Sequence, residues 1–358
     1  MDIAFWLDDV QLAQETAFVR HLVMGLKAEG QQVTFLARSD MDLSQLPTLG
    51  SRCLTYRWNG WERLPVLQKL RLNGLSRTLA DNPPDVLVVW GSADAAIVGA
   101  LADAVPALPM VLWAWDASEL FSPLARLPAI RQIIASSVPI ASRLPANYAT
   151  PVTVIHPGTY TEETVACYDV EGQLPCLVSL DPLEDKSAYE ALIKACRMLV
   201  DTNQDFLLFA YDTGQAEYAI WRVAEQLNIL DRFSFVPYQH DTEPLLLHGD
   251  LYIHILPASR VQYRTLEAMG RGLAVITTPN HAADYLLDNQ TCRVVGPQTA
   301  DAWHEVLREM TQDRPRAAAI ARKAQQFIRD RHSMARTLEQ FGSICRQAAG
   351  VAIPLPAR

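Results

Sequence analysis

Residues 257–267 bring together side chains that can hold a phosphorylated ligand. The candidates among them are the guanidinium groups of Arg260 and Arg264, the hydroxyl group of Ser259 and the carboxylate of Glu267. Guanidinium groups bind phosphate oxygens through charge-assisted hydrogen bonds, and backbone N–H groups at the start of a helix add to that attraction. The chemistry that this set favours is therefore the binding of a phosphate-bearing molecule.

The elements around this set form a strand–helix–strand unit. Apolar runs at 251–256 and 273–277 have the length and β-branched content of buried strands. A helix is expected at 261–271, with Ser259 as its N-cap and Gly272 just after its end, where a left-handed residue is needed. Parallel strands joined in this way lie in a sheet with both faces covered, and ligands of such sheets collect beyond the carboxyl ends of the strands. The loop before the helix is thus the expected ligand site.

The alternation of apolar strands with helices continues along most of the chain. Further strands are expected at 2–8, 32–37, 85–90, 110–115, 132–136, 152–155, 177–180 and 206–210. Further helices are expected at 13–29, 95–103, 216–226, 244–248, 300–310 and 315–331. Strands that alternate with helices predict an α/β class built on parallel sheets.

The polar, acidic stretch at 161–175 has neither a helical nor a strand period, which predicts a linker. A chain of 358 residues is long enough for two domains of ordinary size. We therefore expect an N-terminal domain at 1–160 and a second domain at 176–332.

Composition limits the classes of function and partner. The net charge of −9 argues against general binding to nucleic acid. No apolar run approaches about 18 residues and the N-terminus lacks a cleavable apolar pattern, so neither a membrane span nor a signal peptide is indicated. The six cysteines are scattered without a CxxC pair, which is typical of reduced thiols. A cytoplasmic protein is the expectation.

Several common catalytic motifs are absent from the sequence. It contains no GxGxxG after a strand, no GxxxxGK[ST], no HExxH and no GxSxG, which argues against the usual dinucleotide, P-loop, zincin and α/β-hydrolase sites. The eight histidines lack metal-ligand spacing, and His248 and His254 are expected to be a loop residue and a strand residue. No metal and no other cofactor is therefore expected.

Residues 52–77 differ from the rest of the chain in charge and aromatic content. They hold six cations and a single acid, Glu62, together with Trp58 and Trp61. A basic, Trp-bearing amphipathic helix can lie on an anionic membrane surface or hold an anionic acceptor, which would place the protein at the inner face of a membrane. The alternative is a crossover helix that packs its leucines on its own sheet, the more common role of such a face.

The stretch TLEAMGRGLAVITT, at 265–278, resembles the L-E-A-M-A-x-G-x-P-V-I helix and strand of retaining, family-4-type (group 1) glycosyltransferases of the GT-B fold. The resemblance implies two Rossmann-like domains facing across a cleft, with the last helix and tail, 333–358, crossing back to the first domain. It also implies that Glu267 binds the ribose hydroxyls of a nucleotide-sugar donor. Ser259 stands where the family has a second Glu, which touches the donor sugar.

A second stretch resembles the part of this family that holds the donor diphosphate. DPLEDKSAYEALIKACRML, at 181–199, is similar to the motif G-R-L-x-x-x-K-G, whose Arg and Lys neutralise the diphosphate. Lys186 occupies the Lys position, but Asp181 stands at the Arg position, where a carboxylate repels the ligand. Arg260 and Arg264 are the candidates to replace the missing Arg.

Other positions keep the pattern in part. Gly214, in YDTGQ, is the glycine that remains of a Gly-rich turn in the family. Trp115 stands where the family has a His beside the donor sugar. Asp116 follows at the carboxyl end of a strand, where it is either a site carboxylate or the N-cap of the next turn. The first loop, DDVQLAQE, contains no glycine, although the family often has a Gly pair there.

The resemblance implies transfer of a sugar, with retention and without a metal, from a nucleotide-sugar donor to a saccharide or lipid-linked acceptor. The candidate catalytic residues are Asp116 and Lys186, and the candidate donor-binding residues are Glu267, Lys186, Ser259, Arg260, Arg264 and Gly214. Because Asp181, Ser259 and Trp115 depart from the pattern, the alternative is a catalytically inactive binding or scaffold protein of the same fold. A sugar epimerase, which can share this fold, lacks supporting residues.

Overall fold

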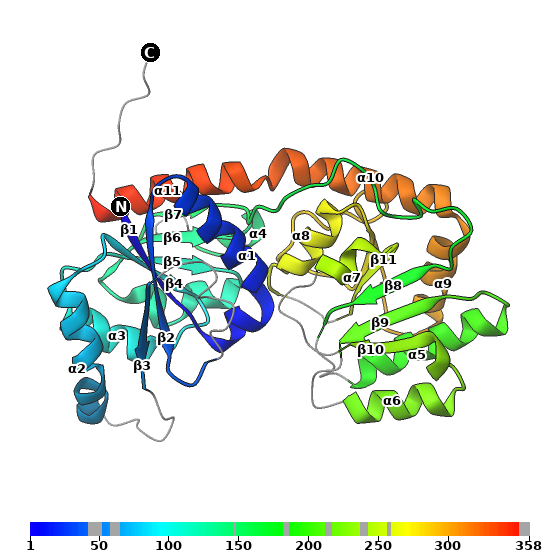
Figure 1. Ribbon diagram of the computed structural model, residues 1–358, viewed down its shortest axis with the longest axis horizontal. Coiled ribbons are helices and arrows are strands. Elements are labelled where there is room, and N and C mark those ends of the chain that lie inside the picture. Colours follow the sequence, from blue (N-terminus) through cyan, green and yellow to red (C-terminus); the bar gives the residue numbers. More distant parts are fainter. Residues whose placement is uncertain are drawn as a thin grey trace, which may run out of the picture. The chain divides into compact units, whose positions relative to one another are not determined.

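The computed structural model describes residues 1–41, 52–57, 65–145, 148–181, 186–211, 217–236, 243–255 and 259–350. The chain divides into two compact units. The first unit consists of Met1–Gly158 and Met334–Arg358, and the second of Thr159–Ser333. Each unit has its own parallel sheet covered by helices (Figure 1). The α/β class predicted from the sequence is confirmed.

The first unit is built on a seven-stranded parallel sheet with the order β3-β2-β1-β4-β5-β6-β7. Its strands are β1 (Asp2–Trp6), β2 (Gln32–Arg38), β3 (Arg52–Tyr56), β4 (Val86–Trp90), β5 (Met110–Ala114), β6 (Ile130–Ala135) and β7 (Val152–Val154). Every residue of β4 and of β5 is buried. Strands that are covered on both faces need apolar side chains throughout, which explains the runs VLVVW and MVLWA.

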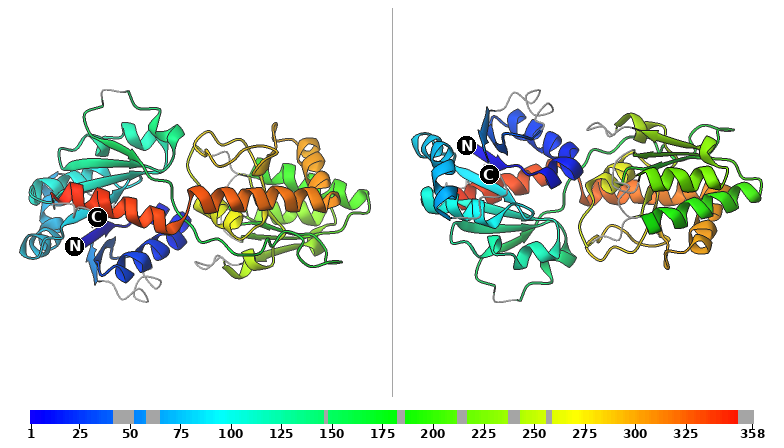
Figure 2. Two further views of the ribbon diagram at one scale, coloured as in Figure 1. Left: turned by 90° about the horizontal axis from the view of Figure 1, so that it is seen from above. Right: turned by 90° about the horizontal axis from the view of Figure 1, so that it is seen from below.

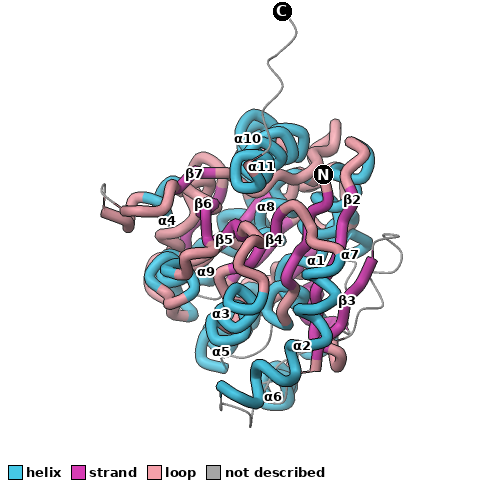
Figure 3. The backbone as a smooth tube through the Cα atoms, turned by 90° about the vertical axis from the view of Figure 1, so that its left-hand side faces the viewer, coloured by secondary structure: helices cyan, strands magenta, loops and turns pink. Residues whose placement is uncertain are grey.

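Helices cover both faces of this sheet. They are α1 (Asp9–Ala28), α2 (Pro65–Asp81), α3 (Ala95–Ala104), α4 (Val138–Ala141) and α11 (Met334–Ala349), with the 3-10 turns η2 (Ala117–Phe121) and η3 (Leu124–Arg126). The C-terminal helix α11 packs on α1 and on β4, β5 and β6, while α2 and α3 lie together on the opposite side of the sheet (Figure 3). The last helix thus belongs to the first unit, as the resemblance implies.

Aromatic rings fill the space between α11 and the central strands of the first sheet. The ring centroid of Phe341, in α11, lies 5.9 Å from that of Phe5 and 5.2 Å from that of Trp113. Trp90 and Trp115 extend the cluster, with centroids 5.3 Å and 6.2 Å from that of Trp113. Aromatic pairs in such geometry add to the free energy gained by burying their area. They hold the end of the chain on the first sheet.

The second unit is built on a six-stranded parallel sheet with the order β10-β9-β8-β11-β12-β13. Its strands are β8 (Cys176–Ser179), β9 (Leu207–Tyr211), β10 (Phe233–Val236), β11 (Leu251–His254), β12 (Ala274–Thr277) and β13 (Cys292–Val294). Its helices are α5 (Lys186–Asp201), α6 (Glu217–Gln226), α7 (Glu243–Leu247), α8 (Tyr263–Gly270), α9 (Ala300–Gln312) and α10 (Arg314–Arg331), with the 3-10 turn η4 (Leu230–Arg232). α5 and α6 lie on one side of the sheet, and α8 and α10 on the other (Figure 2).

The stretch 161–175 has no helix or strand, in keeping with its polar sequence, and it is bonded to the second unit. The backbone N–H of Cys167 donates to the carbonyl oxygen of Gly272 at 2.9 Å. The carboxylate of Asp250 accepts the backbone N–H of Tyr168 at 2.7 Å. These bonds hold the stretch against the end of α8 and the start of β11.

The basic segment 52–77 is not one helix. Its first residues form β3, the edge strand of the first sheet, and α2 begins only at Pro65. Leu72 and Leu75 of α2 are buried, so the crossover-helix interpretation holds for this part. The expectation of a helix at 52–56 is wrong because RCLTY pairs in parallel with β2. Trp58 and Trp61 lie outside the described residues.

Candidate functional site

The candidate site lies in the second unit, at the carboxyl ends of the neighbouring strands β8 and β11. Asp181 follows β8 by two residues, and His254 is the last residue of β11. Oδ1 of Asp181 lies 2.8 Å from Nδ1 of His254, and Oδ2 accepts the backbone N–H of Ile255 at 2.7 Å. Asp181 is only 6% exposed and His254 only 1%. Both oxygens of this carboxylate therefore have donors, and the pair is buried.

Tyrosines close over this pair. The hydroxyl group of Tyr189, in α5, donates to the carbonyl oxygen of Asp181 at 2.8 Å. Tyr252 precedes His254 by two residues and so lies on the same face of the sheet. Burial, and after it the charge of Asp181, raises the pKa of Tyr189 and of Tyr252 well above the usual value. Both phenols are therefore neutral, and that of Tyr189 contributes a hydrogen bond rather than charge.

Arg264 brings a positive charge to the same strand end from α8. Its Nη1 donates to the carbonyl oxygen of Leu180, the residue before Asp181, at 2.7 Å. Its guanidinium carbon lies 5.1 Å from the ring centroid of Tyr211, the last residue of β9. An arginine stacked on a ring keeps a defined orientation. Arg264 thus lies at the end of β8, bonded to the residue that precedes Asp181, and its role in binding a diphosphate stays a prediction.

Glu267 lies three residues further along α8 and is 3% exposed. The helix that carries it packs on β11, β12 and α10. A carboxylate that is buried in this way is costly unless hydrogen bonds or charges compensate it, so such positions are often retained for a specific purpose. The structure therefore holds Glu267 in a fixed place over the sheet, and the prediction that it binds ribose stays open to test.

The start of α8 differs from the expected one. The helix begins at Tyr263 and its N-cap is Gln262, whose side chain makes no capping bond. Instead, the hydroxyl group of Tyr285 accepts the backbone N–H of Gln262 at 3.1 Å and donates to the carbonyl oxygen of Gln262 at 3.2 Å. The prediction of Ser259 as N-cap is wrong because the helix begins after Gln262, whose backbone is bonded by Tyr285, 23 positions after Gln262.

The loop before α8 is only partly described. Ser259 is exposed, and Arg260 is half-buried with its carbonyl oxygen accepting the Nδ2–H of Asn280 at 3.0 Å. This bond fixes the backbone at Arg260 and leaves the direction of its guanidinium group unassigned. Gly214 lies outside the described residues. The donor-binding roles of these three residues remain predictions.

Lys186 is the first residue of α5 and is exposed. It follows β8, so it lies at the sheet edge that Arg264 also reaches. Lys194 and, to a smaller extent, Lys186 lower the pKa of Glu190. Lys186 is thus a solvated cation near the start of a helix, where an anion would also be attracted by the backbone N–H groups.

Asp116 lies in the first unit and caps η2. Its Oδ1 accepts the backbone N–H of Ser118 at 2.7 Å, and Glu119 completes a capping box by accepting the N–H groups of Trp115 at 2.7 Å and Asp116 at 3.3 Å. The N-cap interpretation of Asp116 is confirmed, while its catalytic role remains a prediction. Trp115 is fully buried in the aromatic core, so this position serves packing.

The pairing of Asp181 with His254 was not predicted, although His254 was correctly predicted to be a strand residue. The sequence contains a signal for it. In LYIH, Tyr252 and His254 alternate with Leu251 and Ile253, which join the apolar cluster on the other face of the sheet. His254 therefore faces away from the apolar cluster, at the end of a strand that neighbours β8. An acid that follows β8 can form a hydrogen bond with a histidine in this place.

No group of three or more His, Cys, Asp or Glu side chains in the described ranges could hold a metal ion. The expectation that the protein works without a metal remains a prediction. Among the helices that the structure describes, none is both long and apolar enough to cross a membrane.

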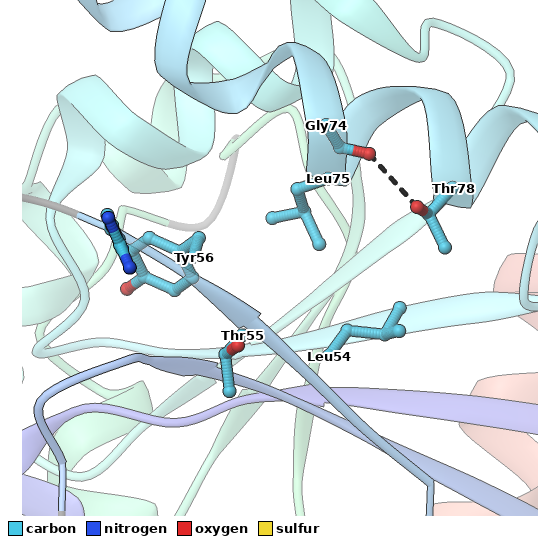
Figure 4. Close-up of a pocket in the computed structure, with 7 residues that line it drawn as sticks. Leu54, Thr55, Tyr56, Gly74, Leu75 and Thr78 are labelled. Atoms are coloured by element: carbon cyan, nitrogen blue, oxygen red, sulfur yellow. Dashed lines mark hydrogen bonds between the residues drawn. The ribbon is translucent and has the colours of Figure 1, made fainter.

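The first unit has a surface hollow of about 480 Å³ between β3 and α2 (Figure 4). It is lined by Leu54, Thr55, Tyr56, Arg57, Gly74, Leu75 and Thr78. The hydroxyl group of Thr78 donates to the carbonyl oxygen of Gly74 at 3.0 Å, and a Cβ atom at Gly74 would meet no atom within 4 Å. All the lining residues except Thr78 belong to the basic segment 52–77, and Thr78 directly follows it. None of the predicted site residues lines the hollow.

Residues 168–327 match the family model described as glycosyl transferases group 1. The match begins at Tyr168 and ends within α10. It contains all six strands of the second sheet and the helices α5 to α9, so it includes the candidate site. No curated protein matches the chain in sequence.

Solved structures share the fold at low sequence identity. HepE from Anabaena in complex with UDP-glucose is 13% identical with a TM-score of 0.77, over 97% of this chain and 100% of that one. Sucrose-phosphate synthase from Thermosynechococcus elongatus is 16% identical with a TM-score of 0.75, over 97% and 98%. A protein described as UDP-N-acetylglucosamine 2-epimerase from Listeria monocytogenes is 13% identical with a TM-score of 0.68, over 100% and 99%.

These identities establish the fold alone, and a fold shared with a protein described as an epimerase does not by itself select a reaction. The family match adds sequence similarity in the unit that holds the candidate site. The second unit therefore resembles the glycosyl transferases group 1 family over residues 168–327, and the chain as a whole has the fold that the GT-B glycosyltransferases share.

Proposed function

We propose that the protein is a glycosyltransferase that binds a nucleotide sugar in its second unit and transfers the sugar, with retention, to a saccharide or lipid-linked acceptor. The observation that carries the proposal is the position of Arg264. Its guanidinium group lies at the carboxyl end of β8, and Glu267 follows in the same helix. One short helix thus offers a cation for a diphosphate and a carboxylate for a ribose.

The chemistry needs stabilisation of a leaving diphosphate. The bond between the anomeric carbon and the phosphate oxygen breaks with its electron pair on that oxygen, and the acceptor oxygen bonds to the anomeric carbon. The acceptor proton passes to the departing phosphate, which lies on the same face when the configuration is retained. Positive charge aimed at the leaving oxygen stabilises the transition state most. Arg264 and Lys186 are the residues that we assign to this task.

A uridine nucleotide is the first donor to test. HepE has been crystallised with UDP and with UDP-glucose. This likeness rests on low identity, so the base and the sugar of the donor are to be determined by experiment. A panel of UDP, GDP and ADP sugars covers the common chemical alternatives.

The acceptor side is assigned to the first unit. Its basic segment 52–77 and the hollow of about 480 Å³ beside Arg57 offer apolar walls and a cation, which suits an anionic or lipid-linked molecule (Figure 4). We propose that the protein contacts a membrane surface peripherally through this segment. For Trp58 and Trp61, which lie outside the described residues, contact with a membrane is expected from the sequence alone.

The alternative is a binding or scaffold protein that has lost catalysis. The specific observation in its favour is the acid at position 181, where the family has an arginine. A carboxylate next to a diphosphate opposes binding unless its charge is compensated. Nucleotide binding and turnover therefore have to be measured separately.

Thermal unfolding in the presence of the nucleotide-sugar panel tests the proposal. A ligand at 100 times its Kd adds about 2.7 kcal/mol to the free energy of unfolding. Glu267→Ala should abolish the stabilisation, whereas Glu305→Ala, at an exposed position of α9 in the same unit, should keep it. Stabilisation by a nucleotide sugar that Glu267→Ala leaves unchanged would place the ligand elsewhere. Absence of stabilisation throughout the panel would contradict the proposal.

Turnover separates the two candidates. Release of nucleoside diphosphate from the stabilising donor, in the presence of membranes or saccharides, is expected for the enzyme. Binding without any release would favour the scaffold.

A further inference from the structure

In the pair formed by Asp181 and His254, only one of the two nitrogen atoms of the imidazole ring is hydrogen-bonded within the described part of the chain. A carboxylate can only accept hydrogen bonds, so Nδ1 of His254 carries the proton in the 2.8 Å contact with Oδ1. The other ring nitrogen, Nε2, is buried and has no hydrogen-bond partner among the described residues. Histidine is also the side chain whose charge ordinarily changes between about pH 5 and pH 8. The pair therefore has an unused place for one proton.

The groups around this pair come from four elements. Tyr189 comes from α5, Tyr252 from β11, and Arg264 from α8 with its guanidinium group over the ring of Tyr211 of β9. The tyrosines are neutral, because burial raises the pKa of Tyr189 and of Tyr252. The charged groups of the proposed site are then the anions of Asp181 and Glu267 and the cations of Arg264 and Lys186, and a proton on His254 makes their sum positive.

A diphosphate bound by Arg264 would lie close to the pair. Arg264 donates to the carbonyl oxygen of Leu180, which is covalently joined to Asp181. Opposite charges nearby favour a protonated imidazole, and the carboxylate that already holds Nδ1 offsets the loss of hydration of a buried cation. Direct contact between ligand and imidazole is not required, since the effect acts through charge.

We propose that Asp181 and His254 act as one proton-binding unit of the donor site, so that a nucleotide sugar binds with uptake of a proton at Nε2 of His254. The inference rests on the proposed function. The proton comes from solvent and returns to it when the nucleoside diphosphate leaves. Protonation of His254 makes the pair neutral overall, so that the acid at position 181 no longer opposes the positive charge of Arg264.

Calorimetry with UDP-glucose, or with the most stabilising nucleotide sugar of the panel, tests the inference. A nucleotide sugar has no terminal phosphate monoester, whose own proton would titrate near pH 6 and confuse the result. Titrations at pH 7 in two buffers of different ionisation enthalpy give the number of protons taken up. We expect about 0.3 to 1 proton per nucleotide sugar. We also expect a Kd that weakens with rising pH by at most about tenfold per unit.

Two substitutions locate the proton. His254→Asn keeps an N–H donor for Asp181 but cannot take up a proton, so uptake should vanish and the Kd should vary less than about twofold between pH 6.5 and pH 8. Asp181→Asn removes the opposing charge, so the Kd at pH 8 should improve at least about threefold. His248→Asn, at an exposed position before β11, is the control and should behave like the wild type. Thermal unfolding without ligand checks that each variant is folded.

The outcomes separate this inference from the proposed function. Binding that depends on Glu267 but takes up no proton overturns the inference and leaves the proposed function intact. Uptake that persists in folded His254→Asn also overturns it. Failure of every nucleotide sugar to bind removes both.

Discussion

The guanidinium group of Arg264 donates to the carbonyl oxygen of Leu180, 84 positions earlier in the chain, at 2.7 Å. This bond joins the helix that carries Glu267 to the strand end that carries Asp181. It also places a permanent cation at the residue that precedes Asp181. The donor site that we propose thus draws on α8 and on the ends of β8 and β11, with Lys186 as a further cation at the start of α5.

Replacement of Arg264 should weaken binding of a nucleotide sugar more than it destabilises the fold. Arg264→Ala removes charge-assisted hydrogen bonds of about 1.5 to 3 kcal/mol, which corresponds to roughly 10- to 100-fold in Kd. Arg264→Lys keeps the charge but loses the planar fork that stacks on Tyr211, so its Kd should be intermediate. Arg222→Ala, which removes an exposed arginine over the ring of Tyr218 in α6, is the matched control. A wild-type Kd for Arg264→Ala, measured by calorimetry, would exclude Arg264 from the site.

An alanine at Gly272 should destabilise the protein more than an alanine at Gly30. Both glycines have φ of 78°, so an alanine at either position carries the same left-handed backbone cost of about 1 to 2 kcal/mol. A Cβ atom at Gly272 would also lie 2.7 Å from Cα of Val165, whereas at Gly30 it would meet no atom within 4 Å. The clash should add about 1 to 3 kcal/mol, because packed backbone must move.

Urea unfolding of both variants measures this difference. Equal losses of unfolding free energy in the two variants would show that the stretch 161–175 does not press on the end of α8. Gly30→Ala thus serves as the control for the backbone conformation alone.

The order of strands and helices could be predicted from local pattern, because it depends on apolar runs and their spacing. Gly272 was assigned correctly for the same reason, since a left-handed glycine ends α8. The start of α8 could not be found in this way. The backbone N–H and carbonyl oxygen of Gln262 are hydrogen-bonded to the hydroxyl group of Tyr285, which is close in space but distant in sequence.

In the candidate site, too, features that depend on local sequence could be predicted, and features that depend on contacts between distant residues could not. Arg264 and Glu267 could be selected because they stand in a loop and helix of recognisable pattern. The effect of Asp181 could not be judged, since its partner His254 comes from another strand, 73 positions later. Asp116 had two interpretations from sequence, and only its hydrogen bond with Ser118 in the structure shows that it caps η2.

Asp250→Asn should destabilise the second unit, and the loss should depend on pH. The carboxylate accepts two backbone N–H groups, those of Tyr168 at 2.7 Å and Cys176 at 2.8 Å. An amide would turn an N–H group toward one of these donors, which should cost about 1 to 3 kcal/mol. Burial raises the pKa of Asp250 above its ordinary value of 3.8, more than its hydrogen bonds lower it.

The sign of the pH effect follows from that raised pKa. The folded protein binds the proton of Asp250 more tightly than the unfolded chain, so this group adds stability as the pH falls through the raised pKa toward 3.8. The gap in unfolding free energy between wild type and Asp250→Asn should therefore widen from pH 6 to pH 4. Asp330→Asn, at an exposed position of α10, should show no such widening. A gap that narrows on acidification would mean that the carboxylate is ionised more easily in the folded protein.

Reversal of charge at Arg57 should weaken attachment to anionic membranes. Arg57 is exposed beside the hollow between β3 and α2, and a cation near an anionic surface contributes about 1 kcal/mol of binding. Arg57→Glu removes one attraction and adds one repulsion, so binding to vesicles that contain phosphatidylserine should fall roughly 10- to 30-fold at low salt. Arg322→Glu makes the same charge change at an exposed position of α10 and should have a much smaller effect. Sedimentation with vesicles measures both, and vesicles of neutral lipid show whether charge is responsible. Equal losses for the two variants would indicate a response to net charge alone, and the membrane role of segment 52–77 would then have to be abandoned.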